Sequence, residues 1–193
     1  MIEFIRMGPE SLATIQVDDA KIVYRRVGNG RPLLVLNGFA ATSGDWDPSF
    51  IHGLASSNEL ILLDNRGIGG SGDDGRPFDI ARLAHDAAHV IETLGFERIS
   101  ILGWSMGGFI AQTLALQHPN RVNKLILFST DPGSSEADLA SAAVWSQLVD
   151  PSGTPHDRAK RLLSLLFPSD VAESFTANSA TSWRLRVRGY LLT

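Results

Sequence analysis

A serine flanked by glycines is the pattern in this chain best suited to chemistry. It lies in Gly103-Trp104-Ser105-Met106-Gly107-Gly108, which has the form G-x-S-x-G. The segment Ile99–Leu102 before it, apolar except for Ser100, predicts a strand, and Phe109–Gln117 after it predicts a helix. Such a sharp turn exposes the serine hydroxyl beside helix N–H groups, which favour a developing negative charge. The pattern predicts a nucleophile at Ser105; the alternative is a glycine-rich turn with an incidental serine.

Two further loops could support this serine. Asn37-Gly38-Phe39 follows the apolar run Leu33–Leu36, and a loop at that place can give one backbone N–H to an oxyanion hole. The residue after the serine gives the other, so we expect the amides of Phe39 and Met106 to form the hole. Without the serine motif, Asn37-Gly38 would be an ordinary turn. The loop 64–72 follows another apolar run, and we interpret it as structural.

The elements that must position these loops alternate along the chain. Strands are predicted at Lys21–Val27, Leu33–Leu36, Leu60–Leu63, Ile99–Leu102 and Leu125–Phe128, and helices at Ile80–Leu94 and Phe109–Gln117. Continuous apolar runs are typical of parallel strands buried on both faces. The chain is therefore predicted to have an α/β fold, a mostly parallel sheet with helices on both faces. Ser135–Leu148 and His156–Phe167 look helical with no strand between them, which indicates a cap.

The order of four motifs resembles the α/β-hydrolase superfamily. They are Asn37-Gly38-Phe39, Asp64-x-Arg66-Gly67-x-Gly69-x-Ser71, Gly103–Gly108 and His118-Pro119-x-Arg121-Val122, and the match covers about residues 20–133. The chain looks most like the branch of cofactor-free haloperoxidase-like esterases, enol-lactonases and C–C bond hydrolases. The resemblance implies the fold, a serine nucleophile at Ser105, an oxyanion hole at Phe39 and Met106, and no cofactor. Asn37 departs from the family, which more often has His there.

The catalytic base is the part that the sequence does not supply clearly. The family order is serine, acid, histidine, and only His118 and His156 follow Ser105. His118 precedes Pro119 at a predicted helix end, which is typical of a structural role. Asp131 and His156 keep the family order, but their separation is short, so they are weak candidates. We expect the last strands of the family fold to be missing, through truncation or a shifted reading frame.

The predicted organisation follows from that expectation. Residues 1–133 form a hydrolase core, 134–180 a helical cap-like segment, and 181–193 a surrogate strand or tail. Without further strands, the strand at Lys124–Ser129 becomes an exposed apolar edge, which predicts aggregation or a homodimer. The Arg-rich stretch Ser182–Thr193 alternates like a strand and could cover this edge, within one chain or swapped between two.

Composition excludes several classes of protein. The 193 residues are 44% hydrophobic and carry a net charge of −4, which gives no basic surplus for nucleic acid or an anionic membrane. There is no cysteine, no signal-peptide pattern and no apolar run of membrane-spanning length, so a cytoplasmic protein is expected. His85 and His89 share a helix face but lack a third metal ligand. Gly67-x-Gly69-x-x-Gly72 resembles a dinucleotide motif but does not open a helix directly.

The sequence thus predicts a serine-nucleophile hydrolase of esters, lactones or related carbonyl compounds. It would act on a small acyl or carbonyl substrate, without cofactor or metal, through Ser105 and a backbone oxyanion hole. The alternative is a catalytically incomplete relic of the hydrolase fold, or a small-molecule binding module, that lacks the acid and histidine of the triad. Labelling of Ser105 by a fluorophosphonate separates the two, because labelling needs an activated hydroxyl.

Overall fold

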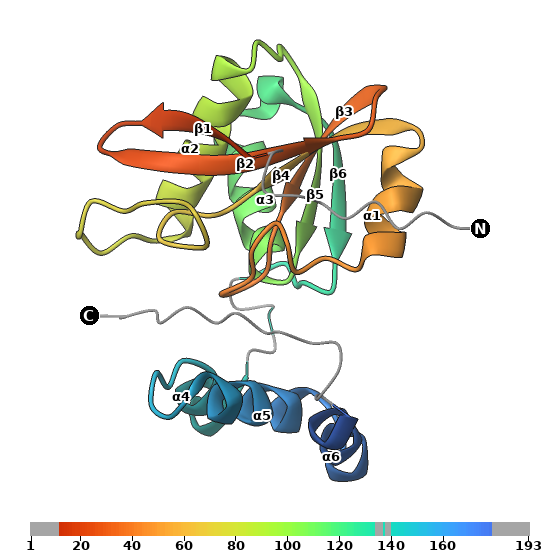
Figure 1. The fold of residues 1–193 in the computed structure, drawn as a ribbon. Helices are drawn as coiled ribbons and strands as arrows, with labels where there is room; N and C mark the ends of the chain where they lie inside the picture. Colours follow the sequence, from red (N-terminus) through yellow and green to blue (C-terminus); the bar gives the residue numbers. More distant parts are fainter. Residues whose placement is uncertain (1–11, 134–136, 138–139, 179–193) are drawn as a thin grey trace. The chain divides into compact units, whose positions relative to one another are not determined.

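The computed structural model describes residues 12–133, 137 and 140–178 (Figure 1). The chain divides into two compact units, Met1–Glu136 and Ala137–Thr193. The predicted strand or tail at 181–193 lies outside the described residues.

A six-stranded sheet forms the first unit. Its strands are β1 (Leu12–Val17), β2 (Ala20–Val27), β3 (Arg31–Leu36), β4 (Asn58–Leu63), β5 (Ile99–Trp104) and β6 (Val122–Phe128). The spatial order is β1-β2-β4-β3-β5-β6. β1 and β2 are antiparallel to their neighbours, whereas β4, β3, β5 and β6 run parallel. The carboxyl ends of the four parallel strands therefore meet at one edge of the sheet, where the predicted site loops follow.

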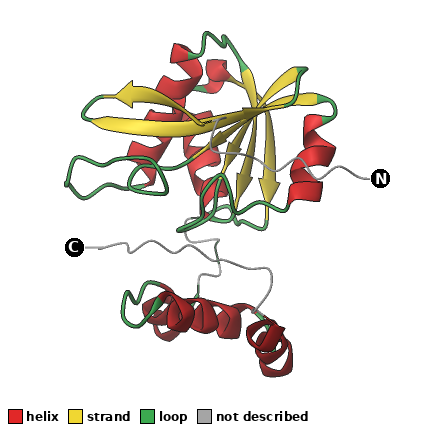
Figure 2. Cartoon of the chain, in the orientation of Figure 1, coloured by secondary structure: helices red, strands yellow, loops and turns green. Residues whose placement is uncertain are grey.

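Both faces of the central strands are buried, which confirms the α/β prediction. Side chains alternate along β3, so Leu34 and Leu36 enter one core cluster while Leu33 and Val35 enter the other. Helices α2 (Ile80–Thr93) and α3 (Met106–Gln117) cover the first face. Helix α1 (Pro48–Ala55) covers the second through Ile51 (Figure 2). This double cover explains why the strands read as unbroken apolar runs.

Local caps fix where the helices of the first unit begin. Asp47 accepts a hydrogen bond from the Phe50 N–H at 2.9 Å, and Pro48 occupies the first turn of α1. Asp79 does the same for Arg82 at 2.9 Å, which starts α2. Helix α3 differs, because its N-cap is Ser105 and the serine side chain makes no capping hydrogen bond. The Ser105 hydroxyl is therefore not engaged in capping helix α3.

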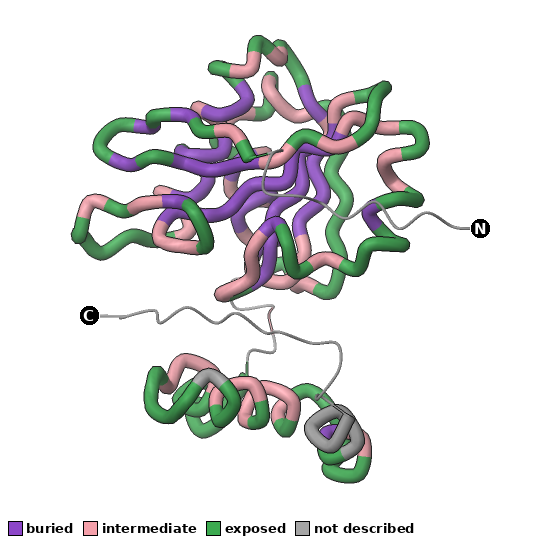
Figure 3. Tube along the Cα trace, viewed as in Figure 1, coloured by how far each residue is buried: buried purple, intermediate pink, exposed green. Residues whose placement is uncertain are grey.

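Strand β6 is the edge of the described sheet, and its outward residues are exposed (Figure 3). Leu125, Ile126, Leu127 and Phe128 retain 38–48% of their accessible surface. Central strands β3 and β4 bury the equivalent residues almost completely. The described part of the chain therefore carries the exposed apolar edge that the sequence predicted.

The second unit contains three consecutive helices, α4 (Ala142–Leu148), α5 (Pro155–Leu166) and α6 (Ser169–Asn178). Thr154 and Asp157 form a capping box at the start of α5. The absence of an intervening strand in residues 140–178 agrees with the helical pattern of the sequence. The predicted helix from Ser135 was too long, because the described helix starts at Ala142 with Ser141 as its N-cap.

Among the described strands and α-helices, β1, α1 and α6 were not predicted, and neither was the short 3-10 helix Pro119–Arg121. β1 shows the alternation of a half-buried strand, with Ile15 and Val17 inward and Gln16 outward. Asp47-Pro48 is the helix-start signal for α1 in the sequence. None of the described helices is long and apolar enough to cross a membrane.

Candidate active site

The backbone at Ser105 has the strained geometry expected of a nucleophile turn. Its φ of 51° and ψ of −120° lie outside the common regions for a residue with a side chain. Two backbone hydrogen bonds hold this conformation, from the Ser105 N–H to the Phe128 carbonyl at 3.0 Å and from the Gly108 N–H to the Ser105 carbonyl at 2.8 Å. The turn is therefore tied to β6 on one side and to α3 on the other.

Close backbone approaches explain the two glycines that flank the serine. A Cβ atom on Gly107 would lie 2.2 Å from the Leu36 carbonyl oxygen and 2.7 Å from that of Asn37. A Cβ atom on Gly103 would lie 2.4 Å from the Gly107 carbonyl oxygen. No side chain fits at either place without moving backbone. The first turn of α3 is thereby packed directly on the end of β3.

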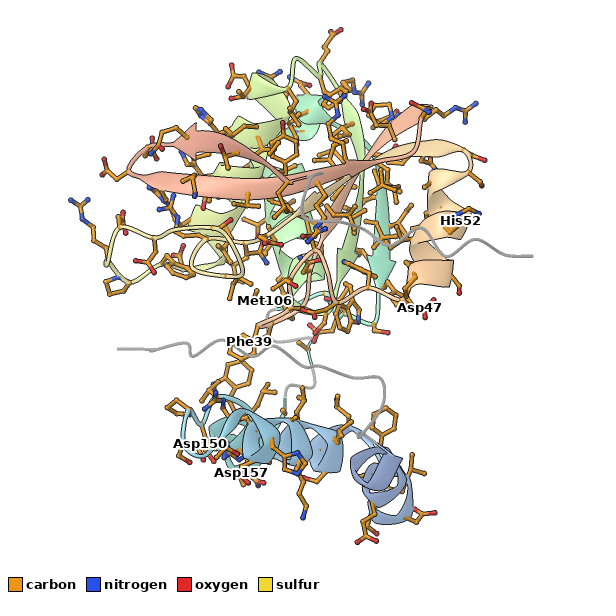
Figure 4. The ribbon with its side chains drawn as sticks, viewed as in Figure 1. Phe39, Asp47, His52, Met106, Asp150 and Asp157 are labelled. Atoms are coloured by element: carbon orange, nitrogen blue, oxygen red, sulfur yellow. The ribbon has the colours of Figure 1, made fainter. Side chains whose placement is uncertain are left out.

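The loop predicted to form the oxyanion hole lies against Ser105. A Cβ atom built on Gly38 would stand 3.3 Å from the Ser105 Cβ atom and 3.3 Å from the Trp104 ring. The amides of Phe39 and Met106 donate no hydrogen bond to any described residue. In Figure 4 both side chains lie toward the edge where the parallel strands end. Two unpaired N–H groups thus come from the segments that flank the serine.

Asn37 connects this loop to the rest of the first unit. Its side chain is wholly buried, and its Nδ2 donates to the Leu63 carbonyl at 2.7 Å. Its Oδ1 accepts a hydrogen bond from Trp46 Nε1 at 2.5 Å. Trp46 in turn contacts the rings of Phe50 and Trp104, with centroids 5.5 and 5.4 Å away. No local sequence pattern pairs Trp46 with Asn37, so this contact could not be predicted from the sequence.

The loop after β4 has a structural role in the described residues. Asp64 is buried and accepts hydrogen bonds from the N–H groups of Ser43 at 2.6 Å and Gly70 at 3.1 Å. Ser71 donates to the Asp64 carbonyl and accepts from the Val23 N–H. These bonds hold the loop against β2 and the segment after β3, in agreement with the interpretation of 64–72 as a structural loop.

Arg66 anchors the same loop to α2 by a buried ion pair. It is 1% exposed, and its Nε and Nη2 donate to the two carboxylate oxygens of Asp86 at 2.8 and 2.7 Å. The hydrogen bonds that Arg66 donates to this carboxylate raise the pKa of Arg66. Arg66 also borders an open hollow of about 410 Å³. Asp74 and Asp79 share that hollow with Arg76 and Arg82, so its charges are largely balanced.

Asp131, the weak candidate for the acid, is held by local hydrogen bonds. Asp131 Oδ1 accepts from the Gly133 N–H at 2.7 Å, and its carbonyl accepts from Gln112 Nε2 at 2.9 Å. His118 ends α3 and precedes a short 3-10 turn, as expected of a structural residue. His156 is exposed in α5 of the second unit. Asp131 and His156 therefore stay weak candidates, and among described residues none hydrogen-bonds to the Ser105 hydroxyl.

The structure does not support a metal site at His85 and His89 or a dinucleotide site at Gly67–Gly72. His85 and His89 lie on α2 with ring centroids 6.5 Å apart, and His85 Nε2 is 3.2 Å from an Asp18 carboxylate oxygen. In the described ranges, no three His, Asp or Glu side chains are grouped to hold a metal ion. The loop Gly67–Gly72 is separated from the start of α2 by a further loop, which is unlike a dinucleotide-binding turn.

A serine turn at the carboxyl edge of a doubly covered, mostly parallel sheet defines the class of α/β-hydrolase-type proteins. A family model described as the alpha/beta hydrolase fold matches residues 31–191. The chain therefore belongs to the α/β-hydrolase fold family.

Individual relatives agree with this assignment. The chain is 33% identical over 116 residues to a non-heme haloperoxidase of Rhodococcus erythropolis, which covers 60% of this chain and 42% of the relative. It is 34% identical over 109 residues to a pimeloyl-[acyl-carrier protein] methyl ester esterase of Pseudoalteromonas atlantica, covering 56% and 40%. The solved structure of a hydrolase from Pseudomonas aeruginosa matches with a TM-score of 0.68 and 26% identity, covering 94% and 71%. The chain spans about half the length of the curated relatives it matches.

Proposed function

We propose that this protein is a serine-nucleophile hydrolase of esters, lactones or related carbonyl compounds. The observation that carries the proposal is the backbone of Ser105, which is held at φ 51° with its hydroxyl free of capping bonds. Strain of this kind persists only where surrounding structure over-determines it, and it gathers at functional sites. The named activities of the relatives, an ester esterase among them, support the same class of reaction.

The chemistry assigns a role to each part of this turn. The Ser105 oxygen attacks the substrate carbonyl carbon while its proton passes to a general base, and the carbonyl oxygen becomes an oxyanion. The N–H groups of Phe39 and Met106 donate hydrogen bonds to that oxygen. The alcohol then leaves with a proton, and water hydrolyses the acyl-serine to release the acid and restore the hydroxyl. Sequence order alone offers Asp131 and His156 as weak candidates for the acid and the base.

A second candidate function has one specific observation in its favour. The Ser105 hydroxyl makes no hydrogen bond to a described histidine or carboxylate, and a serine of ordinary pKa is a poor nucleophile without a base. A binding module with the hydrolase fold, which takes up the substrate without turning it over, would have this arrangement. The oxyanion hole alone would still give such a module a small residual rate.

Fluorophosphonate labelling followed by mass spectrometry distinguishes the two functions. The hydrolase proposal expects one covalent adduct, located on Ser105 and absent from Ser105→Ala. Hydrolysis of a short-chain p-nitrophenyl ester should be lost in the same variant. Failure of the folded wild-type protein to label, together with ester hydrolysis equal to that of Ser105→Ala, would overturn the hydrolase proposal and leave the catalytically incomplete relic or the binding module.

A further inference from the structure

The strongest unexplained feature near Ser105 is the fully paired carboxamide of Asn37. No part of this side chain is exposed, yet each end makes one short hydrogen bond. The Nδ2 donor reaches the last residue of β4 at Leu63, and the Oδ1 acceptor holds the indole N–H of Trp46. A buried polar group is retained only when its partners are in place, so this side chain fixes three separate segments of the first unit relative to one another.

Those segments surround the predicted oxyanion hole. Asn37 is the residue immediately before Gly38-Phe39, and its own carbonyl oxygen lies in close contact with Gly107 at the start of α3. Gly38 packs on Ser105 and on the ring of Trp104. The backbone of Asn37 is therefore confined by α3 while its side chain is confined by β4 and Trp46. Rotation of the Asn37–Gly38 peptide would break the contact with Gly107, and the next peptide, which carries the Phe39 N–H, is held where the Gly38 carbonyl accepts from the Ala41 N–H at 3.3 Å.

The indole of Trp46 extends the same constraint to the aromatic residues beside the serine. Its ring stacks on Phe50 with planes 12° apart and meets Trp104 at 59°. Trp104 directly precedes Ser105, and its pairing partner in β6 is Phe128, whose carbonyl accepts the Ser105 N–H. The Asn37–Trp46 hydrogen bond thus links the predicted oxyanion loop to the aromatic residues next to the nucleophile.

We propose that Asn37, paired with Trp46, is a positioning residue that sets the direction of the Phe39 N–H toward the substrate oxygen at Ser105. The inference rests on the proposed hydrolase function and adds a specific requirement to it. An oxyanion-hole donor acts only within a narrow range of distance, and a shift of about 1 Å can cost about 100-fold in rate. Asn37 does not touch the substrate, so its loss should lower the chemical rate without weakening substrate binding.

Two substitutions break the two hydrogen bonds separately. Asn37→Asp removes the donor to Leu63 but keeps an acceptor for Trp46, whereas Trp46→Phe removes the indole N–H and keeps a ring for stacking. Each should slow Ser105 labelling by about 10- to 100-fold at saturating fluorophosphonate, with little change in half-saturating concentration. The matched control is Asn58→Asp at the other end of β4, where Nδ2 also donates to a main-chain carbonyl, that of Leu54 at 2.8 Å. Its labelling rate should equal that of the wild type.

Asn37→His supplies a rescue with its own signature. A neutral imidazole has one donor and one acceptor nitrogen and can replace both bonds, whereas an imidazolium can only donate. Labelling of Asn37→His should approach the wild-type rate near pH 8. Relative to the wild type it should fall as pH drops below about 6.5, the ordinary pKa of histidine. A role limited to packing would give no such pH-dependent ratio.

Nuclear magnetic resonance of the backbone amides reports on the position of the Phe39 N–H directly and does not require labelling of Ser105. In Asn37→Asp and Trp46→Phe, the Phe39 amide signal should shift or broaden, and it should stay in place in Asn58→Asp. Folded Asn37→Asp with an unchanged Phe39 signal and wild-type labelling overturns the positioning role. A wild-type protein that does not label contradicts the hydrolase function, and the Phe39 signal then decides the positioning role alone.

Discussion

At the scale of single residues, the site depends on positions where the backbone is packed too closely for a side chain. Ser105 has an unfavourable backbone conformation, and the surrounding structure prevents its backbone from relaxing to a more favourable one. Gly107 lies on the Leu36 carbonyl so closely that even one methyl group would collide with backbone. The strain at the serine is therefore balanced by close packing of α3 on β3. Stability and activity should respond together when this contact is lost.

Gly107→Ala tests that relation. The new methyl group would overlap the end of β3, so we expect a loss of about 1–3 kcal/mol in the free energy of unfolding. Labelling of Ser105 should fall as well, because the turn must move. The control is Gly53→Ala in α1, where an added Cβ meets nothing within 4 Å. That change should stabilise the protein by up to about 1 kcal/mol. Chemical denaturation measures both, and equal effects of the two substitutions would contradict the packing argument.

The residues predicted from the sequence are those whose positions follow from local pattern. Ser105, Met106 and Phe39 each occupy a fixed place after a strand, and the parallel sheet brings those places to one edge. The partners of Asn37 and Arg66 did not follow from any pattern. Asn37 bonds Leu63 across 26 positions of sequence, and Arg66 bonds Asp86 across 20. Only the fold decides such pairs.

At the scale of elements, the buried pair of Arg66 and Asp86 fastens the loop after β4 to helix α2. Both side chains are almost fully excluded from water, and the Asp86 carboxylate takes two of the guanidinium hydrogen bonds. Removal of one buried partner leaves the other charge without compensation, which costs far more than the pair itself contributes. We therefore expect the loop to lose its attachment to helix α2 when the pair is broken.

Asp86→Ala should lower the free energy of unfolding by about 3–5 kcal/mol, because it leaves the buried Arg66 charge without its hydrogen-bonded partner and with only the longer ion pair to Asp74 at 3.9 Å. Glu59→Gln is the comparison, since Glu59 pairs with Arg26, whose side chain is 48% exposed, and loss of an exposed pair costs at most about 1 kcal/mol. Denaturant unfolding followed by circular dichroism gives both values. Similar losses in the two variants would show that burial does not govern the Arg66 pair.

The start of α5 carries a pH-dependent cap. The hydrogen bond from the Thr154 hydroxyl, followed by that from the Thr154 N–H, holds the pKa of Asp157 below its usual range. A depressed carboxylate pKa stabilises the folded state above the ordinary aspartate range, and this contribution is lost as pH falls through the lowered value.

Thr154→Ala removes the N-cap of α5 and should destabilise that helix at pH 7, and by less once acid has protonated Asp157. Ser141→Ala at the start of α4 is the matched control, because Ser141 accepts from the Val144 N–H at 3.3 Å without a carboxylate. Its cost should not change with pH in that range. Amide hydrogen exchange in α4 and α5 measures each helix separately, and a pH-independent cost for Thr154→Ala would contradict the role of Asp157.

Helices and strands with long, regular hydrophobic patterns could be predicted from the sequence, whereas those with short patterns could not. The strands buried on both faces and the amphipathic helix α2 stood out, because tertiary packing and local sequence agree there. Helix α1 has only eight residues, and its start signal at Asp47-Pro48 is short. The helix expected from Ser135 failed at its boundary, where Ser141 provides a cap and redirects the chain.

At the scale of the whole molecule, the main feature is the edge strand β6, whose apolar side chains no described residue covers completely. Register places Leu125 and Leu127 beside Ile101 and Gly103 on one face, and Ile126 and Phe128 beside Leu102 and Trp104 on the other. Both faces of the edge are therefore apolar. Exposed flat edges of this kind associate with other strands unless a charge or a proline interrupts them, and Lys124 is the only charged residue in β6.

We expect two copies of the chain to pair through this edge, because an antiparallel register centred on Ile126 is self-complementary. It sets Leu125 opposite Leu127 and Lys124 opposite Phe128, so no like charges meet and the apolar faces continue across the seam. Light scattering after size exclusion should give a dimer for the wild type and a monomer for Leu127→Lys. Leu12→Lys places the same charge at the 41% exposed first residue of β1, on the opposite edge, and should leave the dimer intact. A wild-type monomer, or a dimer lost equally in both variants, would exclude pairing through β6 and leave that edge to another strand.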